Sequence, residues 1–289
     1  ADDDVVGRVW RKDGTLWAGT GEANPPGGGL TYFGDGVYKS TDRGQTWQHM
    51  GLRQSESIGR IAADPTDPDR VFVAAAGHIA RSSGQRGLYR TEDAGKTWEL
   101  VLEPPNATTG AIDVAIHPTN PQLVFASLWD HRRTNGRRIY GGVGSGLFRS
   151  TDGGDTWTRL ETIVGGLAEY DQTQTGLTSH PSLGRIGIAI APTKLEGENE
   201  HRVYIVFGNQ TGPDKGFYVS TDNGDTFSCP RAANGTCGRA YQSNGGFQWW
   251  FGRIYIDPED PLHIFNHDVN LRASLDGGRT WQANAGGQI

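Results

Sequence analysis

An eight-residue motif occurs five times along the chain and constrains its fold more than any other feature. Its common pattern is S/T-x-D-x-G-x-T-W/F, and its Asp recurs at intervals of about 50–70 residues. Asp, Gly, Ser and Thr are frequent in any turn, so one copy would mean little, but five copies in the same order are not a chance occurrence. The copies are STDRGQTW (Ser40–Trp47), TEDAGKTW (Thr91–Trp98), STDGGDTW (Ser150–Trp157), STDNGDTF (Ser220–Phe227) and SLDGGRTW (Ser274–Trp281).

Each copy belongs to a longer repeat of four short β-rich runs, called here strands A to D. In the second repeat these are IGRIAADP, RVFVAAAG, GLYRTED and TWELVLE, separated by Pro, Asp and Gly turns. Repeats that hold several short strands are typical of propeller blades, and helical periodicity is absent. The sequence therefore predicts an all-β fold, a β-propeller of four-stranded antiparallel blades. The single domain 1–289 would contain five blades, at roughly 1–54, 55–106, 107–166, 182–230 and 247–286.

The motif spans the hairpin between strands C and D, and each of its residues has a structural interpretation. The Asp carboxylate and the Ser or Thr hydroxyl can accept hydrogen bonds from backbone N–H groups of the turn. The Gly supplies a positive φ, and the aromatic residue can pack on the neighbouring blade. Because turns repeated around a ring diverge, we assign their Asp residues a structural role rather than catalysis or calcium binding. These residues are Asp42, Asp93, Asp152, Asp222 and Asp276.

The composition agrees with a fold of short strands and excludes some classes of function. The chain holds 43 Gly and 9 Trp but only 1 Met, which favours many tight turns between strands. It has no apolar run of about 18 residues, so we expect no membrane span. Its formal net charge of −6 disfavours a nucleic-acid partner, which would require a basic face. We predict no cofactor.

The two cysteines, Cys229 and Cys237, lie in the polar segment SCPRAANGTCG, which offers too few other ligands for a metal site. In an exported protein they would close a small disulfide loop, and in a cytosolic protein they would be two exposed thiols. We favour export and expect a secreted, periplasmic or cell-surface protein. The initial ADDDVV agrees with a mature exported chain or a trimmed one.

The motif resembles the Asp-box, or bacterial neuraminidase repeat, of sialidases, xyloglucanases, sortilin-type receptors and photosystem II assembly-factor-like propellers. The segments LWAGTGEAN, GDGVYKSTDRGQTW and IGRIAADP are most similar to large secreted bacterial proteins with sortilin-like or glycosyl-hydrolase-like repeats. The resemblance implies a propeller but leaves the function open, because enzymes and non-enzymes share the motif. In those relatives the repeats continue further. We therefore expect a missing segment or a second chain to complete a larger ring, the alternative being a closed ring of five blades.

All long connections are predicted on one face of the propeller. In the usual blade topology the short A–B turns and the Asp-box hairpins share one face. The B–C loops 21–36, 77–87 and 129–146 and the D–A loop 161–184 would then lie on the other face, called here the loop-rich face. Variable loops on a constant scaffold are where binding usually occurs.

Aromatic and arginine side chains gather in these loops. Such side chains suit sugars or peptides, because rings stack and guanidinium groups bind carboxylates. For Trp249 and Trp250 the alternative is packing between blades. Tyr32, Phe33 and Asp35 stand in the first loop, Arg137, Arg138 and Tyr140 in the third, and the predicted ligand-binding residues of the loops are Trp129, His131, Arg132, Arg133, Trp249 and Trp250.

Four of the five A strands begin with Gly-Arg, and these arginines form a second predicted group of ligand-binding residues. Near the mouth of the central channel they would attract an anionic ligand. The alternative, which their recurrence favours, is that each pairs with a carboxylate of the adjoining blade. The arginines are Arg8, Arg60, Arg185 and Arg253, and the third repeat has Ala111 instead.

A glycoside hydrolase is the alternative function. The four channel arginines could supply the arginine triad of a sialidase, but no Tyr–Glu pair is identifiable and VVGRVW replaces that family's Phe-Arg-Ile-Pro signature. An inverting xyloglucanase-like mechanism would need two carboxylates about 6.5–9.5 Å apart. The acidic residues on the loop-rich face are Glu22, Asp35, Asp130, Glu169, Asp171 and Asp268, of which Asp35, Asp130 and Asp268 are the catalytic candidates.

Two Asp/His pairs are the candidates for a metal site. Asp130 with His131 and His267 with Asp268 end B strands in different blades, and together they could ligate a divalent cation. Isolated Asp/His pairs are more often polar surface, so we predict no metal. The sequence as a whole predicts an exported propeller whose loop-rich face binds a carbohydrate or an extended polypeptide.

Overall fold

The computed structural model of the chain describes residues 5–10, 13–23, 32–82, 84–134, 137–160, 183–209, 214–235, 250, 252–267 and 271–283. For residues 5–10, 133–134, 137–138, 209, 214–215 and 283 it describes the backbone alone. Within these ranges, no helix has the length and apolar character needed to cross a membrane.

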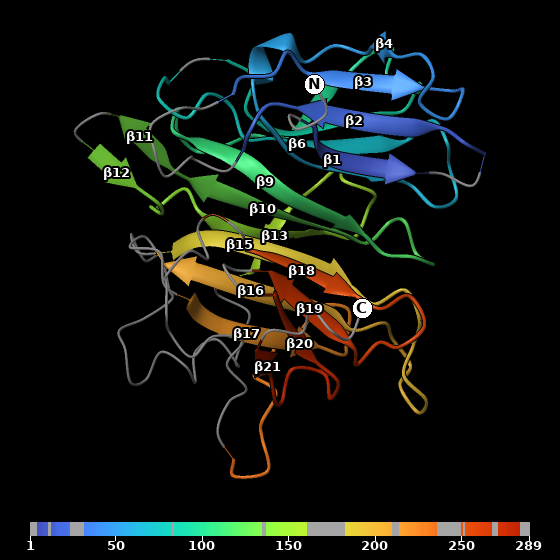
Figure 1. The fold of residues 1–289 in the computed structure, drawn as a ribbon, viewed down its shortest axis with the longest axis vertical. Helices are drawn as coiled ribbons and strands as arrows, with labels where there is room; N and C mark the ends of the chain where they lie inside the picture. The colour runs from blue at the N-terminus through green and yellow to red at the C-terminus, as the bar shows by residue number, and fades with distance from the viewer. Residues whose placement is uncertain are drawn as a thin grey trace.

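The described residues form five blade sheets, all antiparallel, that follow one another along the chain, and one separate two-stranded hairpin (Figure 1). The first sheet contains β1 (Val5–Trp10), β2 (Leu16–Thr20), β3 (Val37–Ser40) and β4 (Gln48–His49). The second contains β5 (Ile58–Ala63), β6 (Val71–Ala75), β7 (Gly87–Thr91) and β8 (Glu99–Leu102), after the short 3-10 helix η1 (Arg53–Ser55). The third contains β9 (Thr109–Ile116), β10 (Val124–Asp130), β13 (Gly146–Ser150) and β14 (Thr158–Arg159).

The fourth sheet contains β15 (Leu183–Ile190), β16 (Val203–Asn209) and β17 (Asp214–Ser220), and the fifth contains β18 (Arg253–Ile256), β19 (Ile264–His267), β20 (Leu271–Ser274) and β21 (Gln282–Ala283). Neighbouring strands in each sheet are neighbours in the repeat, so every repeat folds as a meander. This order confirms the predicted all-β propeller with consecutive antiparallel blades.

Two details differ from the predicted pattern of four strands and plain loops. In the fourth blade the place of strand D is taken by an isolated bridge between Val219 and Ser228, and the sheet has three described strands. In the third blade the B–C loop contains a separate hairpin of β11 (Arg132–Thr134) and β12 (Arg137–Ile139). A long loop can form its own hairpin because strand pairing satisfies its backbone polar groups locally.

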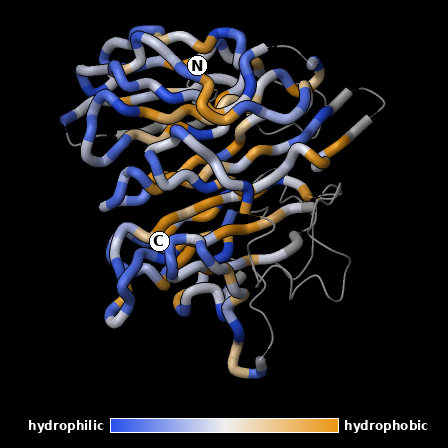
Figure 2. Tube along the Cα trace, turned by 180° about the vertical axis from the view of Figure 1, so that it is seen from behind, coloured by the Kyte–Doolittle hydropathy of each residue, from blue (hydrophilic) through white to orange (hydrophobic). Residues whose placement is uncertain are grey.

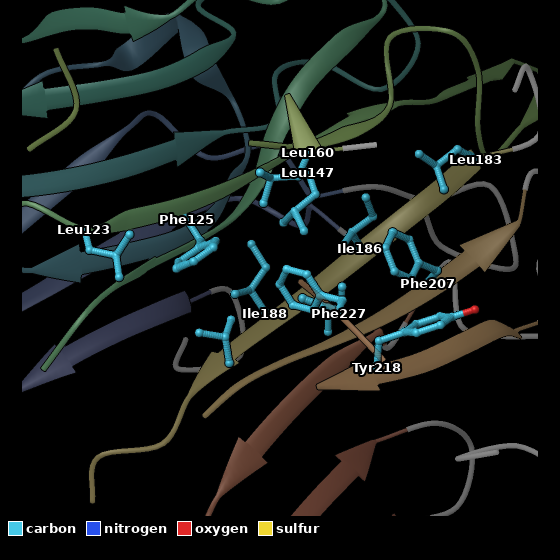
Figure 3. Packing of buried hydrophobic residues seen from close by; sticks show 12 residues of the cluster. Leu123, Phe125, Leu147, Leu160, Leu183, Ile186, Ile188, Phe207, Tyr218 and Phe227 are labelled. Atoms are coloured by element: carbon cyan, nitrogen blue, oxygen red, sulfur yellow. The ribbon is translucent and has the colours of Figure 1, made fainter. Parts of the chain in front are cut away.

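The apolar core lies in layers between consecutive sheets. Between the third and fourth sheets, Phe125 of β10 meets Ile188 of β15 and the Asp-box residue Phe227 (Figure 3). All three are almost fully buried, and each such side chain contributes about 1.5–3 kcal/mol by leaving water. Along the trace, hydrophobic segments run through the strands while hydrophilic ones gather at turns (Figure 2). Each sheet therefore depends on its neighbours for stability.

The Asp-box hairpins share one hydrogen-bond pattern, illustrated by the third copy. The Ser150 hydroxyl donates to Asp152 Oδ1 over 2.7 Å and accepts from Gly154 N over 2.8 Å. Thr156 donates its N–H to Asp152 Oδ1 over 2.9 Å and its hydroxyl to Oδ2 over 2.5 Å. The other four copies repeat these contacts. Each Asp therefore accepts hydrogen bonds within its own turn.

The Asp-box also joins each blade to the preceding one. A Cβ on Gly95 would lie 2.7 Å from Trp17 of the first blade, and one on Gly154 would lie 2.8 Å from Phe72 of the second. Both glycines have a positive φ, of 91° and 97°, which L-residues rarely adopt. Only glycine thus allows the turn to lie directly on the neighbouring aromatic ring. The same approach recurs at Gly224 on Phe125 and at Gly278 on Phe217.

Candidate functional site

The inner strands β5, β9, β15 and β18 surround a central channel with a cavity of about 400 Å³. Aliphatic side chains from all four strands line it, with Arg60 and Tyr255 as its polar members. Three of these strands carry a β-bulge near their start, as β1 also does: an extra residue stands opposite the B strand in β5, β9 and β15. Bulges re-aim the side chains beside them, so they determine which residues reach the channel mouth.

The strand register corrects the expectation that the Gly-Arg arginines are equivalent. Arg60 pairs with Ala74 and Arg253 with His267, each opposite the fourth residue of its B strand. Asp113 occupies this position in the third blade and Gly187 in the fourth. Arg185 lies two residues before Gly187, next to the bulge of β15. The Gly-Arg dipeptide recurs in the sequence. The bulges and an extra residue pair in β15 nevertheless place Arg185 at a different position along its strand from Arg60 and Arg253.

Contacts between blades connect the charged groups at this mouth. Arg60 Nε lies 3.5 Å from Asp113 Oδ1, and Asp113 Oδ2 accepts the N–H of Ile188 over 3.1 Å. The carboxylate of Asp113 therefore joins the second, third and fourth blades. Arg60 therefore takes the alternative role: it pairs with a carboxylate of the adjoining blade.

The other two described arginines at the mouth bind backbone carbonyl groups. Arg253 Nη2 donates to Gly59 O over 2.8 Å, and Arg185 Nη1 donates to Trp250 O over 2.6 Å. Arg185 is fully buried, and burial followed by repulsion from Arg253 lowers its pKa to about 9. A guanidinium held in this way remains charged at neutral pH and gives the mouth a positive field.

The B–C loop of the third blade, residues 129–146, places its main aromatic residue inside the fold. Trp129 is fully buried, its indole N–H donates to Tyr140 O over 2.7 Å, and its ring stacks on His131 at 4.0 Å. The guanidinium of Arg185 lies 5.7 Å from the Trp129 ring centre. Burial, reinforced by Arg86, lowers the pKa of His131 to about 3, so the imidazole is neutral. These predicted ligand-binding residues thus form a layer beneath the surface.

Asp130, a catalytic and metal-ligand candidate, is engaged by donors of its own loop. Its Oδ1 accepts from the Thr108 hydroxyl over 2.7 Å. Its Oδ2 accepts from Asn106 Nδ2 over 3.1 Å and from Gly144 N over 3.3 Å. A buried carboxylate with three donors is held in one orientation, so these contacts give Asp130 a structural role that closes the loop.

Two exposed aromatic residues of the loop-rich face and a buried imidazole beside them form an aromatic ledge, defined here as Tyr32, Phe33 and His78. Phe33 stacks on His78 with ring centres 4.2 Å apart, and the outer residues Tyr32 and Phe33 are 60% and 50% exposed. His78 is buried, and its Nδ1 accepts the N–H groups of Ala80 and Arg81 over 3.0 Å. Burial lowers the pKa of His78, against the opposing charge of Glu56. A fixed neutral ring therefore supports the exposed Phe33.

Ion pairs flank the ledge. Arg81 Nη2 lies 2.8 Å from Glu56 Oε1, and His78 Nε2 lies 3.5 Å from Glu56 Oε2. Asp35, another catalytic candidate, accepts from the Tyr38 hydroxyl over 2.9 Å and pairs with Arg53 over 3.0 Å. Tyr32, Phe33 and Asp35 were predictable from the sequence as loop residues, whereas His78, Glu56, Arg81 and Asp113 were not predicted. Asp113 could have been found by counting back from the Pro that ends strand A.

The remaining candidates are placed only in part. Arg132 lies in β11 and is partly buried. The pKa of Arg86 is lowered to about 10, first by the burial of Arg86 and then by the positive charge of Arg132. Trp250 is partly buried and His267 is exposed. In the part of the chain that the structure describes, no three His, Cys, Asp or Glu residues gather as a metal site. Cys229 is disulfide-bonded. The side chains of Arg8, Arg133, Arg137 and Arg138, and residues Trp249, Asp268, Glu169, Asp171 and Cys237, lie outside the described part.

Comparisons with known proteins place this geometry among propellers. A xyloglucanase of Paenibacillus sp. is 27% identical over 271 residues, which cover 85% of this chain and 23% of that protein. A xyloglucanase of Acetivibrio thermocellus is 24% identical over 86% of this chain and 35% of its own length. The chain thus spans about a quarter to a third of the length of these relatives.

Solved structures resemble the chain in fold. An ancestral GH74 enzyme has a TM-score of 0.60 at 17% identity, covering 98% of this chain and 31% of its own. The GH74 enzyme of Niastella koreensis has a TM-score of 0.56 at 19% identity, covering 97% and 38%. The sequence model of the family described as "Sortilin-Vps10: Sortilin, neurotensin receptor 3" matches residues 35–183, just over half of the chain. The chain therefore belongs to the Sortilin-Vps10 family of Asp-box propeller repeats.

Proposed function

We propose that the chain is a binding scaffold that holds a carbohydrate or an extended polypeptide on its loop-rich face, at the aromatic ledge. The observation that carries this proposal is the pair of exposed rings Tyr32 and Phe33 beside a buried, fixed imidazole. One face of Phe33 rests on His78, which leaves the rest of the ring for a ligand. Flat apolar faces of sugar rings and of peptide side chains stack on such rings, and a pre-ordered ring loses little entropy on binding.

The charged groups around the ledge suit a polar ligand. The Arg53 and Arg81 side chains are about 60% exposed or more although each pairs with a carboxylate, so their remaining N–H groups can donate to hydroxyl or carbonyl groups. The names of the xyloglucanase relatives support a carbohydrate as the first ligand to test. The disulfide of Cys229 supports an oxidising, extracellular or periplasmic compartment, where such polysaccharide ligands occur.

Titration calorimetry with xyloglucan oligosaccharides and a glycan array tests this proposal. Phe33→Ala should weaken binding about tenfold, because it removes a stacking contact of about 1.4 kcal/mol. Leu275→Ala is the matched control: Leu275 is also 50% exposed, but it lies in the Asp-box turn on the opposite face. Equal affinity of the wild-type chain and Phe33→Ala for every bound ligand would refute the ledge as the binding site.

Glycoside hydrolysis is the second candidate function, favoured by the names of the same relatives. Of the catalytic candidates, Asp130 is held by three donors and Asp35 is paired with Arg53, so both carboxylates are already engaged by groups of the protein itself. Release of reducing ends from xyloglucan, abolished by Asp35→Asn, would establish the hydrolase and displace the binding scaffold as the primary function.

A further inference from the structure

The cavity of about 400 Å³ in the central channel lies toward the A–B turns. Arg60, Asp113 and Arg253 share one level of the inner strands, since each stands opposite the fourth residue of its B strand. Among the described residues, none that precedes this level in its strand lines the cavity, whereas the last residues of all four inner strands do. These last residues are Ala63, Ile116, Ile190 and Ile256. The cavity therefore opens on the face of the A–B turns, opposite to the loop-rich face.

A charged layer lies at the inner end of the cavity. Arg253 crosses the channel from β18 to β5, where its Nη2 donates to Gly59 O over 2.8 Å. Arg60 lines the cavity at this level, and its Nε lies 3.5 Å from Asp113 Oδ1. The Nη1 atom of Arg60 is shielded from water and has no hydrogen-bond partner among the described residues. Because a buried guanidinium nitrogen without an acceptor is costly, the inner end of the cavity suits an anionic acceptor.

The walls between this charged layer and the A–B turns are aliphatic. Apart from Arg60 and Tyr255, the described side chains that line the cavity belong to alanine, valine, isoleucine and proline residues. From Arg60 to Ala63 the strand β5 advances by about 10 Å, at about 3.3 Å per residue. An extended alkyl chain advances about 1.3 Å per carbon, because its C–C bonds are about 1.5 Å long. A chain of about eight carbons therefore matches the length of the cavity.

We propose that this cavity binds an aliphatic monocarboxylate of about eight carbons, with the carboxylate on Arg60 and the chain along the aliphatic walls toward the A–B turns. The carboxylate supplies acceptors for Arg60 Nη1, and the alkyl chain leaves water. A sugar would leave its hydroxyl groups without side-chain partners along these walls. The site therefore differs in place and in ligand from the aromatic ledge, and it goes beyond the proposed function.

Acidic side chains of the A–B turns surround the opening without excluding such an anion. Asp67 and Glu259, for example, are exposed, and salt at physiological concentration screens charges in water over about 8 Å. A carboxylate bound at Arg60 lies about 10 Å deeper than the strand ends. The guanidinium group beside it therefore acts on it more strongly than these exposed acids.

Titration calorimetry of the 289-residue chain with butanoate, hexanoate, octanoate and decanoate, and with 1-octanol, tests the site. We expect the affinity to rise about fourfold with each added methylene and to level off beyond about eight carbons, where the chain reaches the A–B turns. Octanol should bind about tenfold more weakly than octanoate, because it lacks the charge that Arg60 attracts. Equal binding of octanol and octanoate, or no binding of octanoate at millimolar concentration, overturns the proposal.

Two variants locate the ligand within the cavity. Arg60→Gln should weaken octanoate binding about tenfold and leave octanol binding unchanged. Ala115→Leu, halfway along the wall, should shift the levelling-off to shorter acids and keep the preference for a carboxylate. Arg279→Gln is the matched control, because it replaces an exposed Asp-box arginine by the residue that the first copy carries there, Gln45, and it should bind octanoate like the wild type.

The ledge variant separates this site from the proposed function. Phe33→Ala should bind octanoate with wild-type affinity, so a failure of the channel site leaves the ledge untouched, and the reverse also holds. Wild-type octanoate affinity in both Arg60→Gln and Ala115→Leu would place the ligand outside the cavity and overturn the proposal. Loss of octanoate binding in Phe33→Ala would overturn it as well.

Discussion

The indole N–H of Trp98 donates a hydrogen bond of 2.7 Å to the main-chain carbonyl of Met50, which lies 48 residues earlier in the preceding blade. The motif that closes the second blade thus also attaches that blade to the first. The equivalent indole N–H groups of Trp47, Trp157 and Trp281 instead donate to a glycine carbonyl of their own turn. What recurs in the second to fifth motifs is the close approach of the turn glycine to an aromatic ring of the preceding blade, so the Asp-box hairpin is also an inter-blade contact.

The first prediction compares equivalent tryptophans in different environments. Trp157→Ala should lower the free energy of unfolding by about 2–4 kcal/mol, because the ring packs in the layer between the second and third blades and its removal leaves a cavity. Trp47→Ala should cost less, about 1 kcal/mol, since Trp47 is 43% exposed and its indole N–H bonds within its own blade. Urea denaturation at low protein concentration measures both, and equal losses would contradict the inter-blade role of the motif.

The second prediction concerns acid stability of the Asp-box turns. Hydrogen bonds from Thr46 and Thr97 lower the pKa of Asp42 and of Asp93 to about 2, from 3.8. The unfolded chain therefore binds these protons more readily, and the stabilisation is complete above about pH 4 and lost as the pH falls towards 2. Unfolding midpoints measured from pH 5 to pH 2 should fall steeply for the wild type and less steeply for Asp93→Asn. Parallel curves would disprove the effect.

The third prediction concerns a buried histidine at an A–B turn. Burial, and then His201, lower the pKa of His117 from 6.5 to about 4, and His117 Nδ1 accepts the N–H groups of Thr119 and Asn120. Because the folded state disfavours the proton, His117 costs nothing above about pH 6.5 and destabilises the fold increasingly as the pH falls towards 4. His117→Asn keeps an acceptor for the turn and should flatten the stability curve between pH 6.5 and pH 4. An unchanged slope would rule out His117 as its source.

The fourth prediction uses two adjacent positions of the second Asp-box. Ala94 has a φ of 59°, which costs an L-residue about 1–2 kcal/mol, so Ala94→Gly should raise the melting temperature slightly. Gly95→Ala should destabilise by more than about 2 kcal/mol, because its φ is 91° and its Cβ would lie 2.7 Å from Trp17. Calorimetry that shows both variants shifting in the same direction would contradict this account of the turn.

Local interactions explain why the sequence predicted the fold so well. In the Asp-box the groups that bond to one another, such as Ser150, Asp152 and Thr156, lie within seven residues. Their pattern is therefore readable without knowledge of the rest of the chain. Five repeats of this turn, each between short β-rich runs, were sufficient to predict consecutive antiparallel blades.

The candidate site was less predictable, because exposure depends on what another blade places nearby. Trp129 and Arg185 stand beside long connections but are buried, because Trp129 stacks on His131 and Arg185 binds the main-chain carbonyl of Trp250. Phe33 and Tyr32 stand in another such loop and remain exposed. Both sets of aromatic and arginine residues belong to loops of similar composition. Composition therefore cannot predict which side chains are buried and which are exposed.

The sequence alone thus determined the repeated hairpins, their strands and the propeller they build, because these depend on neighbours along the chain. The tertiary structure decided which arginine faces the channel, as the bulges in β5, β9 and β15 shift each side chain relative to its B strand. It also decided which aromatic rings meet water, because a ring is covered only where the next blade lies on it. Register and burial are properties of pairs of strands and sheets, and no single segment contains them.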